Sequence, residues 1–210
     1  MRKIMIKAVL FDLFGTLATG FCDPEQRIIE RFNLTYEYKF VENYVCGTKF
    51  QDMDSYIQTI LHGLKLPNTL ETRKTLEAIF EKESALDKIK PEVSELLKGL
   101  KNRGYKLGMI SNIPNPHFDH PEKCGIKKYF DVIVYSYEVG MTKSNPEIFT
   151  LALSSLHVEP SEAVMVGDSM NSDIHPAEAL GIKGILFDPN NKNPTYASRI
   201  TTLLELEGFL

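Results

Sequence analysis

Five short stretches of the chain are apolar at almost every position, and segments with helical patterning separate them. The apolar stretches fall at residues 4–11, 105–110, 131–135, 163–167 and 183–187. Near-continuous apolar runs of this length are typical of parallel strands that helices cover on both faces. Because strands and helices alternate along most of the chain, we predict right-handed crossovers and an α/β fold with a doubly wound, Rossmann-like parallel sheet.

Two of the segments between strands carry readable helix starts. One begins at Pro91 and continues with acidic residues, and a second begins at Pro146 in the same way. Proline suits the first turn because its missing N–H would have no helical partner there, and early carboxylates favour the helix dipole. We therefore expect helices over residues 91–100 and 146–153.

Residues 17–88 interrupt this alternation of strands and helices. Residues 23–26 (Asp-Pro-Glu-Gln) have the pattern of a capping box with proline at the first helical position. Thr35 and Asn68 predict two further helix starts, and residues 61–67 predict a break. The sequence thus predicts about four helices inserted directly after the first strand.

The insertion divides the chain into two predicted domains. Residues 1–16 plus 89–210 would form the sheet-containing core, and residues 17–88 a separate all-helical domain. The inserted segment contains four aromatic residues at a spacing of four, namely Phe32, Tyr36, Phe40 and Tyr44. This spacing places them on one helix face, and we interpret them as the core of the insertion rather than as a substrate-binding box.

Composition and charge exclude several classes of protein. The 210 residues are 43% hydrophobic, and a formal net charge of −4 gives no basic footprint for nucleic acid or anionic membranes. No apolar run is long enough to span a bilayer, and Lys7 and Asp12 break the N-terminal run that could imitate a signal peptide. Cys22, Cys46 and Cys124 are odd in number and widely spaced. They predict buried free thiols in a cytoplasmic protein.

Four segments carry polar residues of candidate chemistry, and three of these segments end predicted strands. In chain order the polar residues are Asp12, then Ser111 and Asn112, then Lys143, then Asp168 and Asp173. The segments FDLFGTL, GMISN, TKSNPEIF and VGDSMNSD resemble, in this order, the four motifs of the haloacid dehalogenase (HAD) superfamily. The resemblance covers nearly every residue outside 17–88. It identifies that segment as the helical cap that many members insert at this point.

The resemblance implies a role for each polar residue. Asp12 would be the nucleophile, because it stands where the first aspartate of the family pattern D-x-D-x-[TV] stands. Ser111 and Asn112 would hold the oxygens of the transferred phosphoryl group together with neighbouring backbone N–H groups. Lys143 would be the cation of the third motif and would contact both the nucleophile and the substrate.

The resemblance also implies a metal site. It predicts that the first and fourth strands lie side by side at the reversal of the strand order, where doubly wound sheets bind ligands. Asp12, Asp168 and Asp173 would then lie close together and would need cations in order to stay ionised. Lys143 supplies one cation, and Mg²⁺, which prefers oxygen ligands, would supply the other. The implied metal ligands are Asp12, the Phe14 backbone carbonyl and Asp168, with Thr16, Asn171 and Asp173 around them.

Phe14 occupies the position at which the family's phosphatases carry a second aspartate as general acid/base. Such catalysis is typically worth ~10²–10⁴-fold. The aromatic residue resembles the first motif of 2-haloacid dehalogenases, which work without metal, whereas Gly167-Asp168-Ser169 resembles the phosphatase form. We favour a Mg²⁺-dependent phosphatase that acts on a small organophosphate through an aspartyl phosphate. The alternatives are a 2-haloacid dehalogenase-like hydrolase, with Asp12 attacking carbon, and a slow or non-catalytic phosphate-binding module.

Several residues are candidates for the missing proton-transfer role, and the sequence does not choose among them. They include His175, Glu37, His62 and the tyrosines of the cap. His117 and His120 form an H-x-x-H segment, but no ligand spacing accompanies it, so we predict a solvated loop. The cap shows no cluster of Arg or Lys that would name a substrate. The sequence carries no signal for an oligomeric state.

Overall fold

The computed structural model describes residues 5–19, 23–83, 88–114 and 125–210. Cys22, Cys124, His117 and His120 lie outside these ranges. Cys46 is a buried free thiol, as predicted. Within the described ranges, no helix is both long enough and apolar enough to cross a lipid bilayer.

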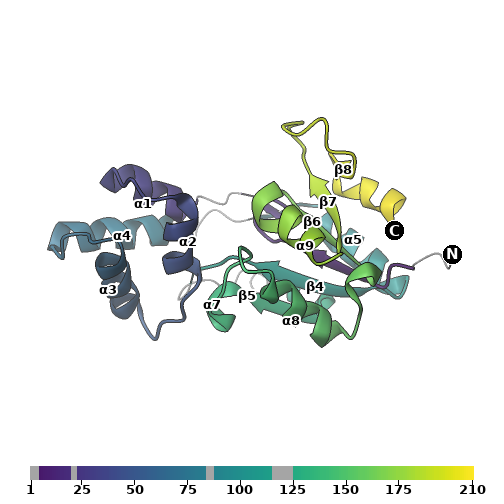
Figure 1. The fold of residues 1–210 in the computed structure, drawn as a ribbon, viewed down its shortest axis with the longest axis horizontal. Helices are drawn as coiled ribbons and strands as arrows, with labels where there is room; N and C mark the ends of the chain where they lie inside the picture. Colours follow the sequence, from purple (N-terminus) through teal and green to yellow (C-terminus); the bar gives the residue numbers. More distant parts are fainter. Residues whose placement is uncertain (1–4, 20–22, 84–87, 115–124) are drawn as a thin grey trace.

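A six-stranded sheet forms the centre of the larger part of the molecule (Figure 1). Its strands are β1 (Ala8–Phe11), β4 (Lys106–Ser111), β5 (Val132–Tyr135), β6 (Ala163–Gly167), β7 (Lys183–Phe187) and β8 (Arg199–Ile200). They lie in the order β5-β4-β1-β6-β7-β8, and every pairing is parallel. The five predicted strands are confirmed, with β1 shorter than expected, and β1 and β6 are neighbours. The two-residue strand β8 was not predicted.

Helices cover both faces of this sheet, as the apolar strands required. One face carries α5 (Val93–Asn102) and the 3₁₀ helix η4 (Leu203–Phe209), and the other carries α8 (Glu147–Leu156) and α9 (His175–Ala179). Alternate residues of β1 serve the two layers, because successive side chains of a strand point to opposite faces. Val9 and Phe11 pack with α5, whereas Ala8 and Leu10 pack with α8. Helices α5 and α8 confirm the two predicted helices, and each runs slightly further than expected.

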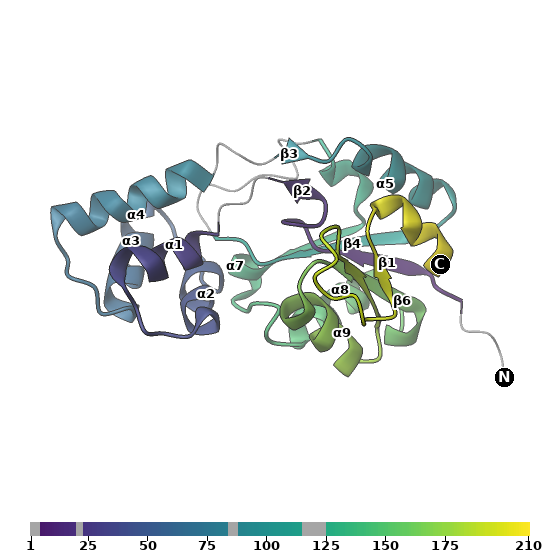
Figure 2. The ribbon, with the colours of Figure 1, turned by 90° about the horizontal axis from the view of Figure 1, so that it is seen from above.

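Four helices form a separate cluster at one end of the molecule, which we call the helical insertion (Figure 1). They are α1 (Pro24–Phe32), α2 (Tyr38–Cys46), α3 (Met53–Gly63) and α4 (Leu70–Glu83). They enclose their own buried apolar cluster, which includes Ile28, Val45, Tyr56, Ile60 and Phe80. The C-terminal helix η4 lies at the opposite end of the molecule (Figure 2).

A short antiparallel ribbon connects the helical insertion to the sheet. The strands β2 (Ala18–Thr19) and β3 (Lys88–Ile89) pair with each other on the way into and out of the insertion. Ala18 is buried within the apolar layer of the sheet, together with Leu17. The two crossing segments are therefore held together beside the sheet, and the domain limits at residues 17 and 88 remain a prediction.

One of the three predicted helix starts in the insertion is confirmed, and two are displaced. Asp23 accepts a hydrogen bond from the Gln26 backbone N–H at 2.9 Å and caps α1. Helix α2 begins three residues after Thr35, and it has no side-chain cap that could mark its first residue. Helix α4 begins two residues after Asn68, because the hydroxyl of Thr69 accepts the backbone N–H three positions later.

The aromatic residues spaced by four lie at the edge of the insertion's core. Phe32, Tyr36 and Tyr44 are half-buried against that core, but Phe40 is 40% exposed. The rings contact one another, with centroids 4.8 Å apart for Tyr36–Phe40 and 5.1 Å apart for Phe40–Tyr44. The interpretation as core was therefore wrong for Phe40, because aliphatic residues and Tyr56 fill the centre. None of these four residues lines the cavity described next.

Candidate active site

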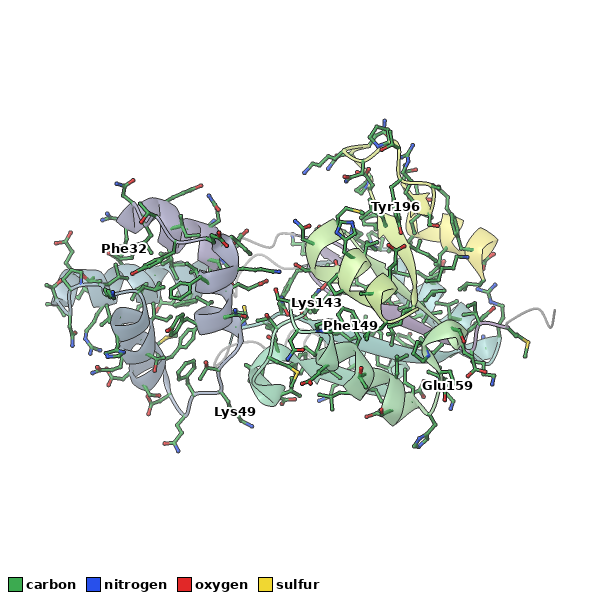
Figure 3. The ribbon with its side chains drawn as sticks, in the orientation of Figure 1. Phe32, Lys49, Lys143, Phe149, Glu159 and Tyr196 are labelled. Carbon is green, nitrogen blue, oxygen red and sulfur yellow. The ribbon has the colours of Figure 1, made fainter. Side chains whose placement is uncertain are left out.

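A cavity of about 660 Å³ lies between the carboxyl ends of the strands and the helical insertion. Asp12, Phe14, Asn112, Lys143, Asp168 and Asp173 line it, so the sheet brings together most of the residues singled out from the sequence. Figure 3 shows Lys143 at the side of the sheet that faces the insertion. A volume of this size suits a small organic ligand.

Asp12 sits at the centre of the cavity floor and is only 4% exposed. It directly follows β1, and its backbone N–H donates to the carbonyl of Val166 in the neighbouring strand at 2.9 Å. The Thr16 hydroxyl donates to Asp12 Oδ2 at 3.2 Å. Sheet pairing and the turn after the strand therefore fix this carboxylate, and Thr16 lies beside it as predicted.

Two glycines allow the carboxylates to approach the backbone closely. Gly15 has a φ of +81°, a backbone conformation that residues with a side chain rarely adopt. A Cβ at this position would lie 2.2 Å from Asp168 Oδ2. A Cβ on Gly167 would lie 2.3 Å from the carboxyl group of Asp173. These glycines are required because any side chain would displace the neighbouring acid.

Lys143 connects two of the three acids and is 4% exposed. Its Nζ lies 2.6 Å from Asp12 Oδ1 and 2.6 Å from Asp173 Oδ1. Burial alone would lower the pKa of Lys143, but the charges of Asp12 and Asp173 and their hydrogen bonds raise the pKa above its ordinary value. Lys143 therefore stays a cation, as the sequence predicted.

One lysine does not fully compensate the acids. Burial raises the pKa of Asp12 to about 7 against the lowering effect of Lys143, and the charges of Asp173 and Asp168 contribute to this rise. Desolvation in the cavity and the charge of Asp173 raise the pKa of Asp168 to about 6, although Asp168 keeps an exposed edge. A further cation would relieve this repulsion.

The three acids have the geometry of a candidate metal site. Asp12, Asp168 and Asp173 each offer an oxygen, and these atoms lie within 4.8 Å of one another. Asp173 uses both of its oxygens within the protein, because Oδ1 binds Lys143 and Oδ2 accepts the Ser169 backbone N–H at 3.0 Å. Asp173 thus positions Lys143, and both oxygens of Asp12 are likewise contacted, Oδ1 by Lys143 and Oδ2 by Thr16.

The second motif contributes Ser111 and Asn112 at the end of β4. Asn112 Oδ1 accepts the backbone N–H of Lys143 at 2.8 Å, and its Nδ2 donates to Glu42 Oε1 at 2.7 Å. The hydroxyl of Ser111 is buried and has no hydrogen-bond partner within the described part of the chain. Buried hydroxyls are usually paired, so the unpaired Ser111 Oγ is unusual, although Ser111 is not among the residues that line the cavity.

Asn171 is the sequence-predicted site residue that the fold places elsewhere. It is exposed and lines an adjacent cavity of about 770 Å³, together with Glu37 and His175. Residues 170–174 form a single π-helical turn, η3 (Met170–Ile174), in which Asp173 points inward and Asn171 outward. The number of residues from Asp168 could not predict which of these two side chains points inward, because their directions depend on whether the turn is an α- or a π-helix.

Sequence reasoning missed Lys90, which directly follows β3 and lines the cavity that contains Asp12. Its Nζ donates to the backbone carbonyls of Gly15, at 3.0 Å, and Thr16. It also lies 4.3 Å from the ring centroid of Phe187. No local pattern marks this residue, because only the ribbon of β2 and β3 brings it to the first motif.

The helical insertion also contributes residues to the cavity that sequence reasoning missed. These residues are Asp23, Glu25, Glu42 and Cys46, and they line the cavity with Tyr38, one of the cap tyrosines that the sequence offered for the proton-transfer role. Helix α2 holds them against the sheet through contacts with the core: Ser136 Oγ donates to the carbonyl of Cys46 at 2.6 Å, and Thr142 Oγ1 donates to Asn43 Oδ1 at 2.8 Å. The insertion is therefore docked over the site.

Comparison with curated proteins identifies sugar- and triose-phosphate phosphatases among the relatives. The glyceraldehyde 3-phosphate phosphatase of Methanothermobacter thermautotrophicus is 31% identical over 197 residues, which are 88% of this chain and 86% of that protein. The ribulose-1,5-bisphosphate 5-phosphatase of Halopiger xanaduensis is 35% identical over 104 residues. That match covers 49% of this chain and 44% of the relative, so it spans less than half of the relative's length.

Solved structures of both phosphatases and dehalogenases share the fold. A HAD phosphatase from Thermococcus onnurineus superposes with a TM-score of 0.66 at 26% identity, with 97% of each chain covered. A 2-haloacid dehalogenase from Pseudomonas syringae pv. Tomato DC3000 gives the same TM-score and coverage at 22% identity, which is a likeness of fold alone. The family model of haloacid dehalogenase-like hydrolases matches residues 6–181. With four ordered motifs meeting at one sheet edge, this match shows that the chain belongs to the haloacid dehalogenase-like hydrolases.

Proposed function

We propose that this hydrolase is a Mg²⁺-dependent phosphatase that acts on a small organophosphate through a phosphorylated Asp12. The observation that carries the proposal is the set of three carboxylates within 4.8 Å of one another, with Lys143 bound to two of them. Such a set has an excess of negative charge that a divalent cation would balance. The phosphatase from Methanothermobacter, 31% identical over most of both chains, supports the same reaction class.

Asp12 would attack phosphorus, with formation of an O–P bond and departure of the substrate's alkoxide or carboxylate. Lys143 would hold the Asp12 carboxylate in line and neutralise charge on the phosphoryl oxygens. Asn112 would position Lys143 through its backbone N–H, and the unpaired Ser111 hydroxyl would donate to a phosphoryl oxygen. Water would then cleave the aspartyl phosphate and regenerate Asp12.

Mg²⁺ fits the donor set, since the candidate ligands offer only oxygen. Asp12 and Asp168 would hold it from the side chains, and the backbone carbonyl of Phe14, which borders the same cavity, would be the third protein ligand. A bound Mg²⁺ would stabilise negative charge on the phosphoryl group. Gly15 and Gly167 matter here because they allow the acids to lie this close to the backbone.

A dehalogenase is the second candidate, and Phe14 is the observation that favours it. Phe14 is buried beside Asp12, and its side chain has no acidic proton that it could transfer. Displacement of halide from carbon needs no general acid. The acids weigh against this candidate. Asp168 would repel the carboxylate of a haloacid unless a cation neutralised it.

The two candidates separate in a paired assay. Purified protein is offered acetyl phosphate and p-nitrophenyl phosphate with Mg²⁺ or with EDTA, and 2-chloropropionate without metal. We expect phosphate release that requires Mg²⁺, and no chloride release. Chloride release without metal would replace the phosphatase by the dehalogenase.

Metal binding is measured independently by thermal melting. We expect Mg²⁺ to raise Tm relative to EDTA, because a ligand of the native state stabilises it. Beryllofluoride, which mimics a phosphorylated carboxylate, should raise Tm further in the presence of Mg²⁺. Stabilisation by beryllofluoride with no turnover of either substrate class would instead indicate a phosphate-binding module. A cytoplasmic location remains a prediction from the cysteines.

A further inference from the structure

The helical insertion contributes three carboxyl groups to the cavity, beside Tyr38 and Cys46. They belong to Asp23, Glu25 and Glu42, which we call the acidic wall. Within the described residues, the insertion places no lysine or arginine at this cavity. The wall lines the same cavity as Asp12, so a substrate with its phosphoryl group at Asp12 would share this cavity with the wall. Its chemistry therefore bears on the substrate.

Glu25 is the most deeply buried member of the acidic wall. It is 1% exposed, and its Oε1 accepts a hydrogen bond from Cys46 Sγ at 2.8 Å. Its Oε2 is buried without a hydrogen-bond partner among the described residues. An unpaired buried oxygen costs free energy, so a carboxyl group left in this state beside a ligand cavity is most simply paired by the ligand.

Glu42 links the acidic wall to the catalytic centre. It accepts a hydrogen bond from Asn112, which in turn accepts the backbone N–H of Lys143. Burial raises the pKa of Glu42 against the hydrogen bond from Asn112, and the charges of Asp23 and Asp173 also raise it. The charge of Lys143 has the opposite effect. The wall and the centre thus interact electrostatically across one cavity.

The charge balance of the cavity indicates what the ligand must carry. Six carboxyl groups and two lysines line it within the described part of the chain. A divalent metal ion and a phosphoryl dianion cancel each other, so a bound phosphate ester leaves the excess of carboxyl groups over lysines unchanged. The wall's own acids are too dispersed for a second metal, since Asp12, Asp168 and Asp173 form the one described group with close ligand atoms.

We propose that the acidic wall binds an ammonium group on the substrate's leaving group, so that the preferred substrates are small phosphate esters that carry an amine. An ammonium would pair with Glu25 Oε2 and lie among the three carboxylates, and this charge-assisted contact would be strong because the site is largely buried. The inference rests on the proposed phosphatase function and specifies its substrate class.

Matched substrates test the preference. The pairs are 2-aminoethyl phosphate with 2-hydroxyethyl phosphate, and glucosamine 6-phosphate with glucose 6-phosphate, each assayed with Mg²⁺. We expect kcat/KM to be at least about tenfold higher for the amine in at least one pair. Equal values in both pairs, or a preference for the hydroxyl compounds, would overturn the inference. Because p-nitrophenyl phosphate is measured alongside, loss of all phosphatase activity is distinguished from loss of the preference.

Variants of the acidic wall test whether its carboxyl groups cause the preference for amine-bearing substrates. Glu25→Gln keeps an acceptor for Cys46 but removes the charge. Asp23→Asn also removes a charge, and its side-chain oxygen still accepts the Gln26 backbone N–H that caps the helix. Each should lower the amine-to-hydroxyl ratio of kcat/KM about tenfold. Glu30→Gln, an exposed change on the same helix, should leave the ratio unchanged. A ratio that stays at its wild-type value in both wall variants would contradict the proposal.

A binding experiment keeps the inference testable if turnover is absent. Calorimetric titration compares 2-aminoethylphosphonate with 2-hydroxyethylphosphonate, which the enzyme cannot hydrolyse as esters, in the presence of Mg²⁺. The aminated phosphonate should bind about tenfold more tightly to the wild type, and Glu25→Gln should abolish the difference. Equal affinities for the wild type would overturn the inference, whatever the state of the catalytic step.

Discussion

The two walls of the cavity each carry three carboxyl groups, but only one wall has a cation built into it. On the sheet side, Lys143 lies 2.6 Å from both Asp12 and Asp173. On the insertion side, Glu25 Oε1 accepts the thiol of Cys46, Oε2 has no hydrogen-bond partner among the described residues, and burial raises the pKa of Glu25 well above the ordinary value. The sheet side therefore has a cation in place before a ligand binds, whereas in our proposal the insertion side, which has no lysine or arginine at the cavity among the described residues, gains its counter-charge from a ligand.

This difference separates two uses of acidic residues. The proposed nucleophile Asp12 has to be ionised in order to attack, and Lys143 beside it favours the ionised form. A carboxyl group that recognises a ligand gains selectivity if it has no partner within the protein. A ligand without the matching positive charge then leaves the carboxyl group without a partner. Four substitutions test the contrast, in order of expected effect.

Asp12→Asn removes the central acid of the sheet side. We expect phosphatase turnover to fall by more than ~10³-fold with the fold intact, because an amide cannot form the aspartyl phosphate. Steady-state rates and a thermal melt measure the two effects. Asp54→Asn, an exposed change in the insertion, is the control and should be neutral. Turnover in Asp12→Asn close to that of the wild type would remove both enzymatic candidates.

Lys143→Gln removes the built-in cation. We expect destabilisation by about 3–5 kcal/mol in EDTA, because buried acids lose their partner. Lys101→Gln is a matched control that breaks a half-exposed lysine–aspartate pair, also 2.6 Å long, and should cost less than about 1 kcal/mol. Urea unfolding of both variants gives the comparison. Similar costs for the two would show that Lys143 does not compensate the buried acids.

Phe14→Asp adds an acid to the sheet side at the position of the family's acid/base. If the site is a phosphatase, hydrolysis of alkyl phosphates should accelerate by up to ~10²-fold, with less gain for p-nitrophenyl phosphate, whose leaving group needs no proton. Loss of the buried ring should cost ~3 kcal/mol or more of stability. Phe14→Leu controls for packing and should show no acceleration. A folded Phe14→Asp protein that is slower than wild type would favour the dehalogenase.

Glu25→Gln removes an uncompensated acid from the insertion side. Because the folded pKa of Glu25 lies above its unfolded value near 4.5, its proton stabilises the fold at low pH, and this contribution is lost as pH rises from 4.5 towards the raised folded pKa. The variant should therefore gain in Tm relative to wild type between pH 4.5 and 8. A change of about 1 kcal/mol corresponds to roughly 2–4 °C. A gain that shrinks with rising pH would show that Glu25 is ionised and paired in the fold.

Local patterns in the sequence determined the sheet and the catalytic acids. Apolar runs placed the five main strands, because burial between two helix layers leaves no polar positions in a strand. The ends of those strands placed Asp12, Ser111 and Asp168 at one edge, since parallel strands end together. Asp23 marked the start of α1 for a similarly local reason, because a cap bonds within three residues.

Tertiary structure decided the contents of the cavity beyond those motifs. Glu42 and Asn112 are 70 residues apart, and Lys90 reaches a carbonyl 75 residues away. The π-helical turn directed Asp173 inward and Asn171 outward, which the spacing of the motif does not specify. Local periodicity cannot encode such pairs, because they depend on how the insertion docks against the sheet. The identity of the motif acids followed from sequence alone, but the acidic wall opposite them exists only in the folded protein.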